Sequence, residues 1–147
     1  MTNHARFLEA QRDVYPRVVA ELKAGRKQSH WIWFIFPQIA GLGSSSNSKR
    51  FALTSIEDAE SYCNEPILFD RLLECSDLVL SHRARAISDI MGTPDDLKLR
   101  SSMTLFTLAK PDVVEFREVL DTFFEGSLDP LTLKLCTRDC EPLRYRS

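Results

Sequence analysis

Apolar side chains near the N-terminus recur every three or four residues, the spacing of one face of an α-helix. The residues on this face are Phe7, Leu8, Gln11, Val14, Tyr15, Val18, Val19 and Leu22. Gly25 follows as the predicted C-terminal cap, while Pro16 predicts either a kink or the first residue of a second helix. This part of the chain therefore commits one helical face to a hydrophobic core.

The stretch "HWIWFIF", residues 30–36, consists almost entirely of large apolar side chains. Ser29 is the predicted cap of a short buried helical turn, which Pro37 ends because proline disfavours helical geometry in the residue before it. A strand is the alternative, since aromatic and β-branched residues favour strands. We prefer the helical turn, followed by a loop over "GLGSSSNSKR".

Capping signals divide the middle of the chain into further helices. Ser55 and Asp58 form a loose capping box before a helix that runs to about Cys63. Pro66 begins the next helix, and "ISDIMG" predicts one more helical turn that Gly92 ends.

In the C-terminal third of the chain, two predicted helices begin with the same signal, a capping residue followed by proline. Thr93 is the predicted cap and Pro94 the first residue of one helix, and Asp129 with Pro130 begins the last. Between them, a helix that ends at Gly126 buries Val114 (or Val113), Phe116, Val119, Leu120, Phe123 and Phe124. The pattern predicts an all-α fold, a single compact domain of about six or seven helices over residues 1–136, with 137–147 as a loosely packed tail.

Composition narrows the function classes. The 147 residues, 44% of them hydrophobic, fit one globular domain, and the net charge of −2 argues against general nucleic-acid binding. Neither a signal peptide nor an apolar stretch of about 18 residues is present, so we expect a cytoplasmic protein without a membrane partner. Cys63, Cys75, Cys136 and Cys140 lack paired metal-ligand spacing and are predicted to be free thiols, with no metal or cofactor.

Charge is unevenly distributed along the chain. The segment from Leu22 to Arg50 contains basic residues and no acidic one, whereas residues 55–77 contain seven acidic residues and one arginine. The basic segment includes Gly41 and Gly43, whose turns could expose backbone amides to a phosphate or carboxylate. Candidate ligand-binding residues here are Arg26, Lys27, Trp31, Trp33, Gln38 and Ser44, with His30 as a candidate acid or base. The alternative places both tryptophans in the core and bonds His30 to a backbone carbonyl.

A second candidate group lies on the helix that follows Pro94. Lys98 and Ser102 are four residues apart and share a face, and Asp95 lies within reach of the lysine. A desolvated Lys98 is a candidate catalytic base or nucleophile, and Ser102 a ligand contact. The alternative is a surface ion pair between Lys98 and Asp95.

Three motifs carry a family resemblance: "AGRKQSHWIWFIFPQIAGLGSSSNSKRF", "PILFDRLLEC" and "GTPDDLKLRSSMTLF". In this order and spacing they resemble an uncharacterised bacterial family known as a domain of unknown function, some members of which are labelled calpastatin-like. The resemblance implies a mainly helical fold and brings no assigned activity. A compact apolar chain does not support calpain inhibition, which calls for a disordered, repeat-bearing chain.

The pattern of acidic start, lysine, methionine and leucine-phenylalanine after Pro94 also resembles, over this short stretch, the lysine-bearing helix of the NADAR family, although the aligned tryptophan is missing. That resemblance implies N-glycoside cleavage on ADP-ribose-like or riboside-phosphate compounds. The leading hypothesis is a site for an anionic, nucleotide-like small molecule between the basic loop and the Lys98 helix. The rival is a non-catalytic module that binds a protein partner through the acidic 55–77 segment or through the C-terminal tail.

Overall fold

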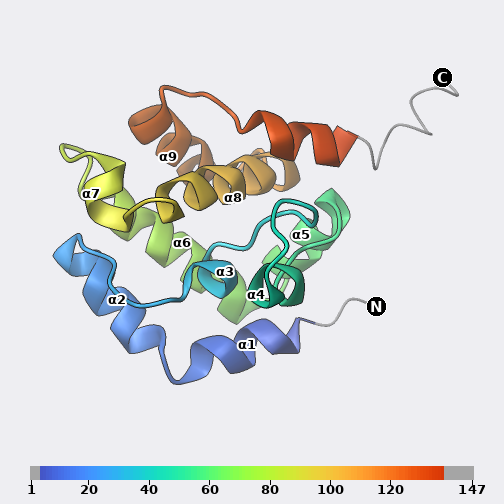
Figure 1. Ribbon diagram of the computed structural model, residues 1–147, viewed down its shortest axis with the longest axis horizontal. Helices are drawn as coiled ribbons and strands as arrows, with labels where there is room; N and C mark the ends of the chain where they lie inside the picture. The colour runs from blue at the N-terminus through green and yellow to red at the C-terminus, as the bar shows by residue number, and fades with distance from the viewer. Residues whose placement is uncertain (1–3, 138–147) are drawn as a thin grey trace, which may run out of the picture.

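The computed structural model describes residues 4–137, and every regular element in that range is a helix (Figure 1). The helices are α1 (Ala5–Arg12), α2 (Tyr15–Ala24), α3 (Ile32–Ile35), α4 (Ser46–Arg50), α5 (Ile56–Cys63), α6 (Pro66–Leu80), α7 (Ile87–Met91), α8 (Asp95–Ala109) and α9 (Val114–Phe124), followed by a helix over residues 130–137. The predicted all-α class is confirmed. Apart from Thr137, the predicted tail lies outside the described residues.

The predicted number of helices is wrong, because the described part of the chain has ten rather than six or seven. The short turns α3 and α7 were predicted, but α4 lies in the stretch predicted as a loop, because its five residues are too few for a helical period to show in the sequence. Of the two alternatives predicted at Pro16, the second helix is present: α2 begins at Tyr15, and Pro16 lies in its first turn.

Two side chains from the segment between α6 and α7 bind the C-terminal end of α2. Gly25 adopts the left-handed conformation with φ of 73°, as expected for a C-terminal cap. An imidazole nitrogen of His82 lies 2.8 Å from the carbonyl oxygen of Leu22, and Arg85 donates to the carbonyl oxygen of Gly25 at 2.7 Å. These contacts therefore fix the position at which the segment after Gly25 begins.

The predicted helix starts are confirmed in part. Ser55 accepts a hydrogen bond from the backbone N–H of Asp58 at 3.0 Å, and α5 ends at Cys63 as expected. The predicted cap at Thr93 is wrong: Pro94 is the capping residue, and α8 begins at Asp95. The reason is local, since the backbone of Pro94, with φ −94° and ψ 12°, lies outside helical geometry.

Helix α8 lies at the centre of the fold, between α9 on one side and α3 and α5 on the other (Figure 1). Its buried side chains point in several directions, as expected for a helix surrounded by others. They are Leu99, Ser101, Ser102, Met103, Thr104, Leu105, Phe106 and Ala109. On α9, Val114 is exposed and Val113 half-buried, so the second of the two alternatives faces the core.

The stretch 30–36 forms a buried helical turn rather than a strand. Trp31, Ile32, Ile35 and Phe36 are all buried, and the cap of this turn is Trp31 instead of the predicted Ser29. Ser29 has another role, because its hydroxyl donates to Glu21 at 2.6 Å. After the turn, Ile39 and Leu53 form an isolated parallel bridge.

Candidate functional site

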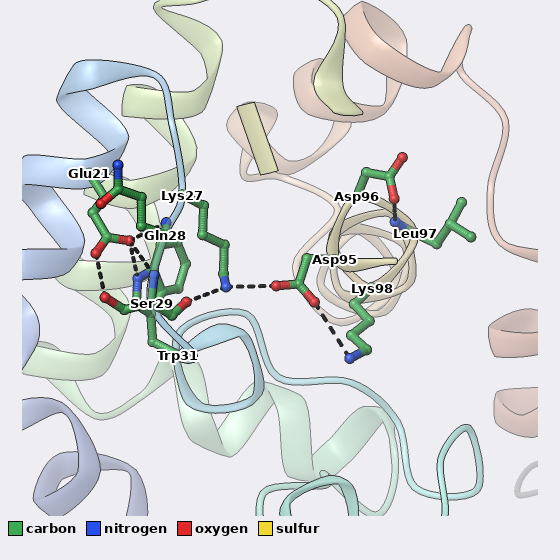
Figure 2. A network of polar contacts seen from close by, with 9 residues as sticks. All are labelled: Glu21, Lys27, Gln28, Ser29, Trp31, Asp95, Asp96, Leu97 and Lys98. Carbon is green, nitrogen blue, oxygen red and sulfur yellow. Dashed lines mark hydrogen bonds and ion pairs between the residues drawn. The ribbon is translucent and has the colours of Figure 1, made fainter. Parts of the chain in front are cut away.

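The carboxylate of Glu21 organises the segment that leads into α3 (Figure 2). It accepts hydrogen bonds from the backbone N–H groups of Gln28 and Ser29 at 2.8 and 3.0 Å. It also accepts bonds from the Ser29 hydroxyl at 2.6 Å and from the Trp31 indole nitrogen at 2.9 Å. Burial alone would raise the pKa of Glu21, but these hydrogen bonds outweigh it and lower the pKa to about 2. Glu21 is therefore ionised throughout the physiological range.

The segment fixed by Glu21 places Lys27 against the first turn of α8. The ammonium of Lys27 lies 2.6 Å from one carboxylate oxygen of Asp95, and it also donates to the backbone carbonyl of Ser29. The other oxygen of Asp95 lies 3.5 Å from the ammonium of Lys98 (Figure 2). Two lysines from distant parts of the sequence thus share one carboxylate.

Each of these lysines also lies over a tryptophan ring. Lys27 Nζ is 4.7 Å from the ring centroid of Trp31, and Lys98 Nζ is 4.9 Å from that of Trp33. Such cation–π contacts contribute about 0.5–2 kcal/mol, more where the cation is desolvated. The two tryptophans differ in burial: Trp31 is 1% exposed, whereas Trp33 is half-buried and its indole N–H has no hydrogen-bond partner.

The two lysines also differ in burial, and the more buried lysine is the one beside the more buried tryptophan. The side chain of Lys27 is 4% exposed and has the closer contact with Asp95, while that of Lys98 is 27% exposed. One carboxylate cannot neutralise both ammonium groups, so Lys27, Lys98 and Asp95 together carry a net charge of about +1. The excess charge is at the solvent-facing end, on Lys98 and beside Trp33.

Comparison with known proteins places the chain in a family. The family model described as "Protein of unknown function (DUF1810)" matches residues 1–136. The chain belongs to the DUF1810 family. It is also similar to the crystal structure of the conserved hypothetical protein Rv1873 from Mycobacterium tuberculosis, with 46% sequence identity and a TM-score of 0.89. That similarity covers 90% of this chain and 95% of the other, and the search of curated proteins found no match.

In this DUF1810 chain, the predicted site residues divide into two groups. Lys27, Trp31, Trp33 and Lys98 come together around Asp95. The surface pairing of Lys98 with Asp95, the structural alternative, is present as well. The partner of Lys27 was not predicted, because it lies in a segment that the sequence separates by 67 intervening positions from the lysine.

The other predicted residues take no part in that cluster. His30, Arg26 and Ser44 are exposed, and none of their side chains has a hydrogen bond or ion pair within residues 4–137. The alternative that His30 bonds to a backbone carbonyl is therefore wrong. Gln38 is half-buried and pairs through its backbone oxygen with the N–H of Leu53 at 2.9 Å.

Ser102, one turn beyond Lys98, is fully buried, and its hydroxyl lacks a hydrogen-bond partner. Most buried hydroxyls in proteins are paired, so an unpaired one next to a charged cluster is unusual. Its neighbours on α8 do have partners: Ser101 donates to Asp129 at 2.9 Å, and Thr104 accepts from the backbone N–H of Asp129, also at 2.9 Å.

Sequence reasoning missed Glu21, which positions half of the cluster. Its one visible signal was its place as the last acidic residue before the basic segment. Within the described residues, no group of three or more histidine, cysteine or acidic side chains is arranged to hold a metal ion. None of the helices in that range is long and apolar enough to cross a membrane.

Proposed function

We propose that this protein binds a small anionic ligand with a planar ring at the surface formed by Lys98 and Trp33. The observation that carries the proposal is the sharing of Asp95 by two ammonium groups. Because Lys27 is buried and closer to the carboxylate, Lys98 remains undercompensated and partly exposed. An anion is the natural partner of such a charge.

The half-buried ring of Trp33 supports the second part of the proposal. Its face already lies against the ammonium of Lys98, so a ligand that approaches the lysine also meets an aromatic surface. The indole N–H of Trp33 and the hydroxyl of Ser102 have no hydrogen-bond partner, but both atoms are buried, so the proposal rests on the ammonium of Lys98 and the ring of Trp33. A nucleotide or another ring-bearing phosphate combines both features.

The rival hypothesis, a protein-interaction module, has less support. It calls for a contiguous exposed apolar patch. Within the described residues the large exposed hydrophobic side chains are Ile67, Leu97, Val114 and Leu131, which belong to four different helices. Only Ile67 lies in the acidic 55–77 segment.

The test is a thermal-shift screen with nucleotides, sugar phosphates and simple carboxylates, followed by calorimetry on any hit. A ligand at a hundred times its dissociation constant adds about 2.7 kcal/mol of stability. We expect Lys98→Met to abolish the shift. Lys134→Met is the matched control, because Lys134 is exposed on the last helix and has no ion pair within residues 4–137.

A comparison of ligands with and without a ring tests whether Trp33 contributes to binding. Inorganic phosphate is expected to bind more weakly than a nucleotide in the wild type, and Trp33→Leu is expected to remove that difference. A screen without any stabilising ligand, or a hit that Lys98→Met binds as tightly as the wild type, would contradict the proposal.

A further inference from the structure

A groove of about 310 Å³ lies between α1 and α6, remote in sequence from the Lys98 cluster. One face of α1 and one face of α6 line it, at the helical spacings i, i+3, i+4, i+7 and i, i+4. The lining residues are Ala5, Leu8, Glu9, Arg12, Ile67 and Arg71.

The polarity of this groove changes from one end to the other. Arg71 lies at the C-terminal end of α1, where it donates to Gln11 at 3.3 Å and stacks on the ring of Tyr15 at 4.5 Å. Arg12 follows Gln11 and belongs to the same end. Ile67 lies one turn earlier on α6, and it is 49% exposed although it is a large apolar side chain. The groove thus has a cationic end and an apolar end.

The charges of the lining do not cancel. Two guanidinium groups, on Arg12 and Arg71, face one carboxylate, on Glu9. Within the described residues Arg12 has no hydrogen bond or ion pair, and Arg71 contacts only neutral groups. Guanidinium groups bind carboxylates through paired N–H donors, so this end of the groove is suited to a carboxylate head group.

We propose that the α1/α6 groove binds a small carboxylate with an aliphatic tail. The head group lies between Arg12 and Arg71, and the tail covers Leu8 and Ile67. A volume of 310 Å³ equals that of roughly ten water molecules at about 30 Å³ each, enough for a ligand of about ten non-hydrogen atoms. Octanoate has this size and is the probe for the test.

Calorimetric titration of the full chain with octanoate, 1-octanol and acetate separates the two ends of the groove. We expect octanoate to bind at least about tenfold more tightly than octanol, which lacks the charge, or acetate, which lacks the tail. Equal binding of octanol and octanoate, or no binding of octanoate, would overturn the proposal.

Substitutions in the groove test whether octanoate binds there. Arg12→Gln is expected to weaken octanoate binding about tenfold, and Ile67→Asp to abolish it by placing a carboxylate on the apolar wall. Arg17→Gln is the matched control, because Arg17 is an exposed arginine on α2 that does not line the groove. Lys98→Met should also leave octanoate binding unchanged, which keeps this proposal separate from the proposed function. Octanoate binding that survives both groove substitutions would overturn it.

Discussion

Replacement of Asp95 by asparagine tests the shared-carboxylate cluster directly. The change keeps the size and polarity of the side chain and removes the one charge that faces both Lys27 and Lys98. Lys27 is the vulnerable partner, because its side chain is 4% exposed and water cannot replace the lost carboxylate. We expect Asp95→Asn to destabilise the fold strongly.

The magnitude follows from burial. Removal of one partner from a buried ion pair costs about 3–5 kcal/mol. Lys27 retains the Ser29 carbonyl and the Trp31 ring, and Asp95 itself is 20% exposed, so the expected cost lies at the low end, near 3 kcal/mol. About 0.5 kcal/mol of this comes from the loss of a negative charge at the start of α8.

Urea unfolding at pH 7 measures the free energy of unfolding of each variant. Glu57→Gln is the matched control, since Glu57 is an exposed acidic residue in the first turn of α5 and reports the helix-dipole contribution alone. In Lys27→Met/Asp95→Asn the buried cation is absent as well, so this double variant should be more stable than Asp95→Asn. Equal costs for Asp95→Asn and Glu57→Gln, or a double variant less stable than Asp95→Asn, would refute the reasoning.

Three further predictions concern other polar groups and the thiols. Glu21→Gln should destabilise the protein at pH 7, but less as the pH falls from 4.5 towards 2: the folded-state pKa of about 2 lies below the ordinary value of 4.5, so the ionised form stabilises the fold above that range and is lost within it. Ser102→Ala should be neutral or stabilising because the hydroxyl it removes is buried and unpaired, whereas Thr104→Val should cost about 1–3 kcal/mol because it leaves the N–H of Asp129 without a partner. Burial raises the pKa of both Cys63 and Cys75 to about 12, so neither thiol should react with a thiol reagent at pH 8 unless the protein is unfolded.

Urea midpoints of wild type and Glu21→Gln at pH 5, 4 and 3 test the first of these; a difference that stays constant over this range would contradict it. Melting temperatures order the two α8 variants, and a loss of stability in Ser102→Ala as large as that in Thr104→Val would show that the Ser102 hydroxyl has a partner. Peptide mapping after alkylation identifies the modified thiols, with rapid native-state labelling of Cys63 or Cys75 as the contrary result.

The helices that could be predicted from the sequence are those with local causes. Ser55, Pro66 and Gly92 act on backbone groups within a few residues, so their signals are readable without any tertiary contact. The split between α1 and α2 also has a local signal in Pro16, and α4 has one in Ser45, whose hydroxyl accepts a hydrogen bond from the backbone N–H of Ser48 at 3.1 Å. The packing of these helices depends instead on distant contacts, such as that of Gln11, which donates to the carbonyl oxygen of Phe34 at 2.6 Å.

The candidate site could be predicted only as a set of residue types. The sequence supported a hypothesis that the basic segment meets the Lys98 helix, with a core role for both tryptophans as the alternative, and in the structure Lys27, Trp31, Trp33 and Lys98 lie together. It could not indicate which lysine is neutralised, because that depends on distances of 2.6 and 3.5 Å set by the packing of the segment after Gly25 on α8. Nor could the sequence indicate that His30, although chemically suited to be an acid or base, is exposed and has no partner among the described residues.

The arrangement around Asp95 also explains how a stabilising cluster and a binding site can share residues. Glu21 fixes Ser29 and Trp31, which hold Lys27 against Asp95 and thereby use most of the negative charge of that carboxylate. Lys98 is left with the weaker, longer contact as a direct consequence. If Lys27 were absent, Asp95 would pair with Lys98 alone, and its carboxylate would neutralise the positive charge beside Trp33. Lys27→Met should therefore weaken anion binding at Lys98 although Lys27 itself is buried, and calorimetry of that variant with the ligand found for the wild type measures this coupling.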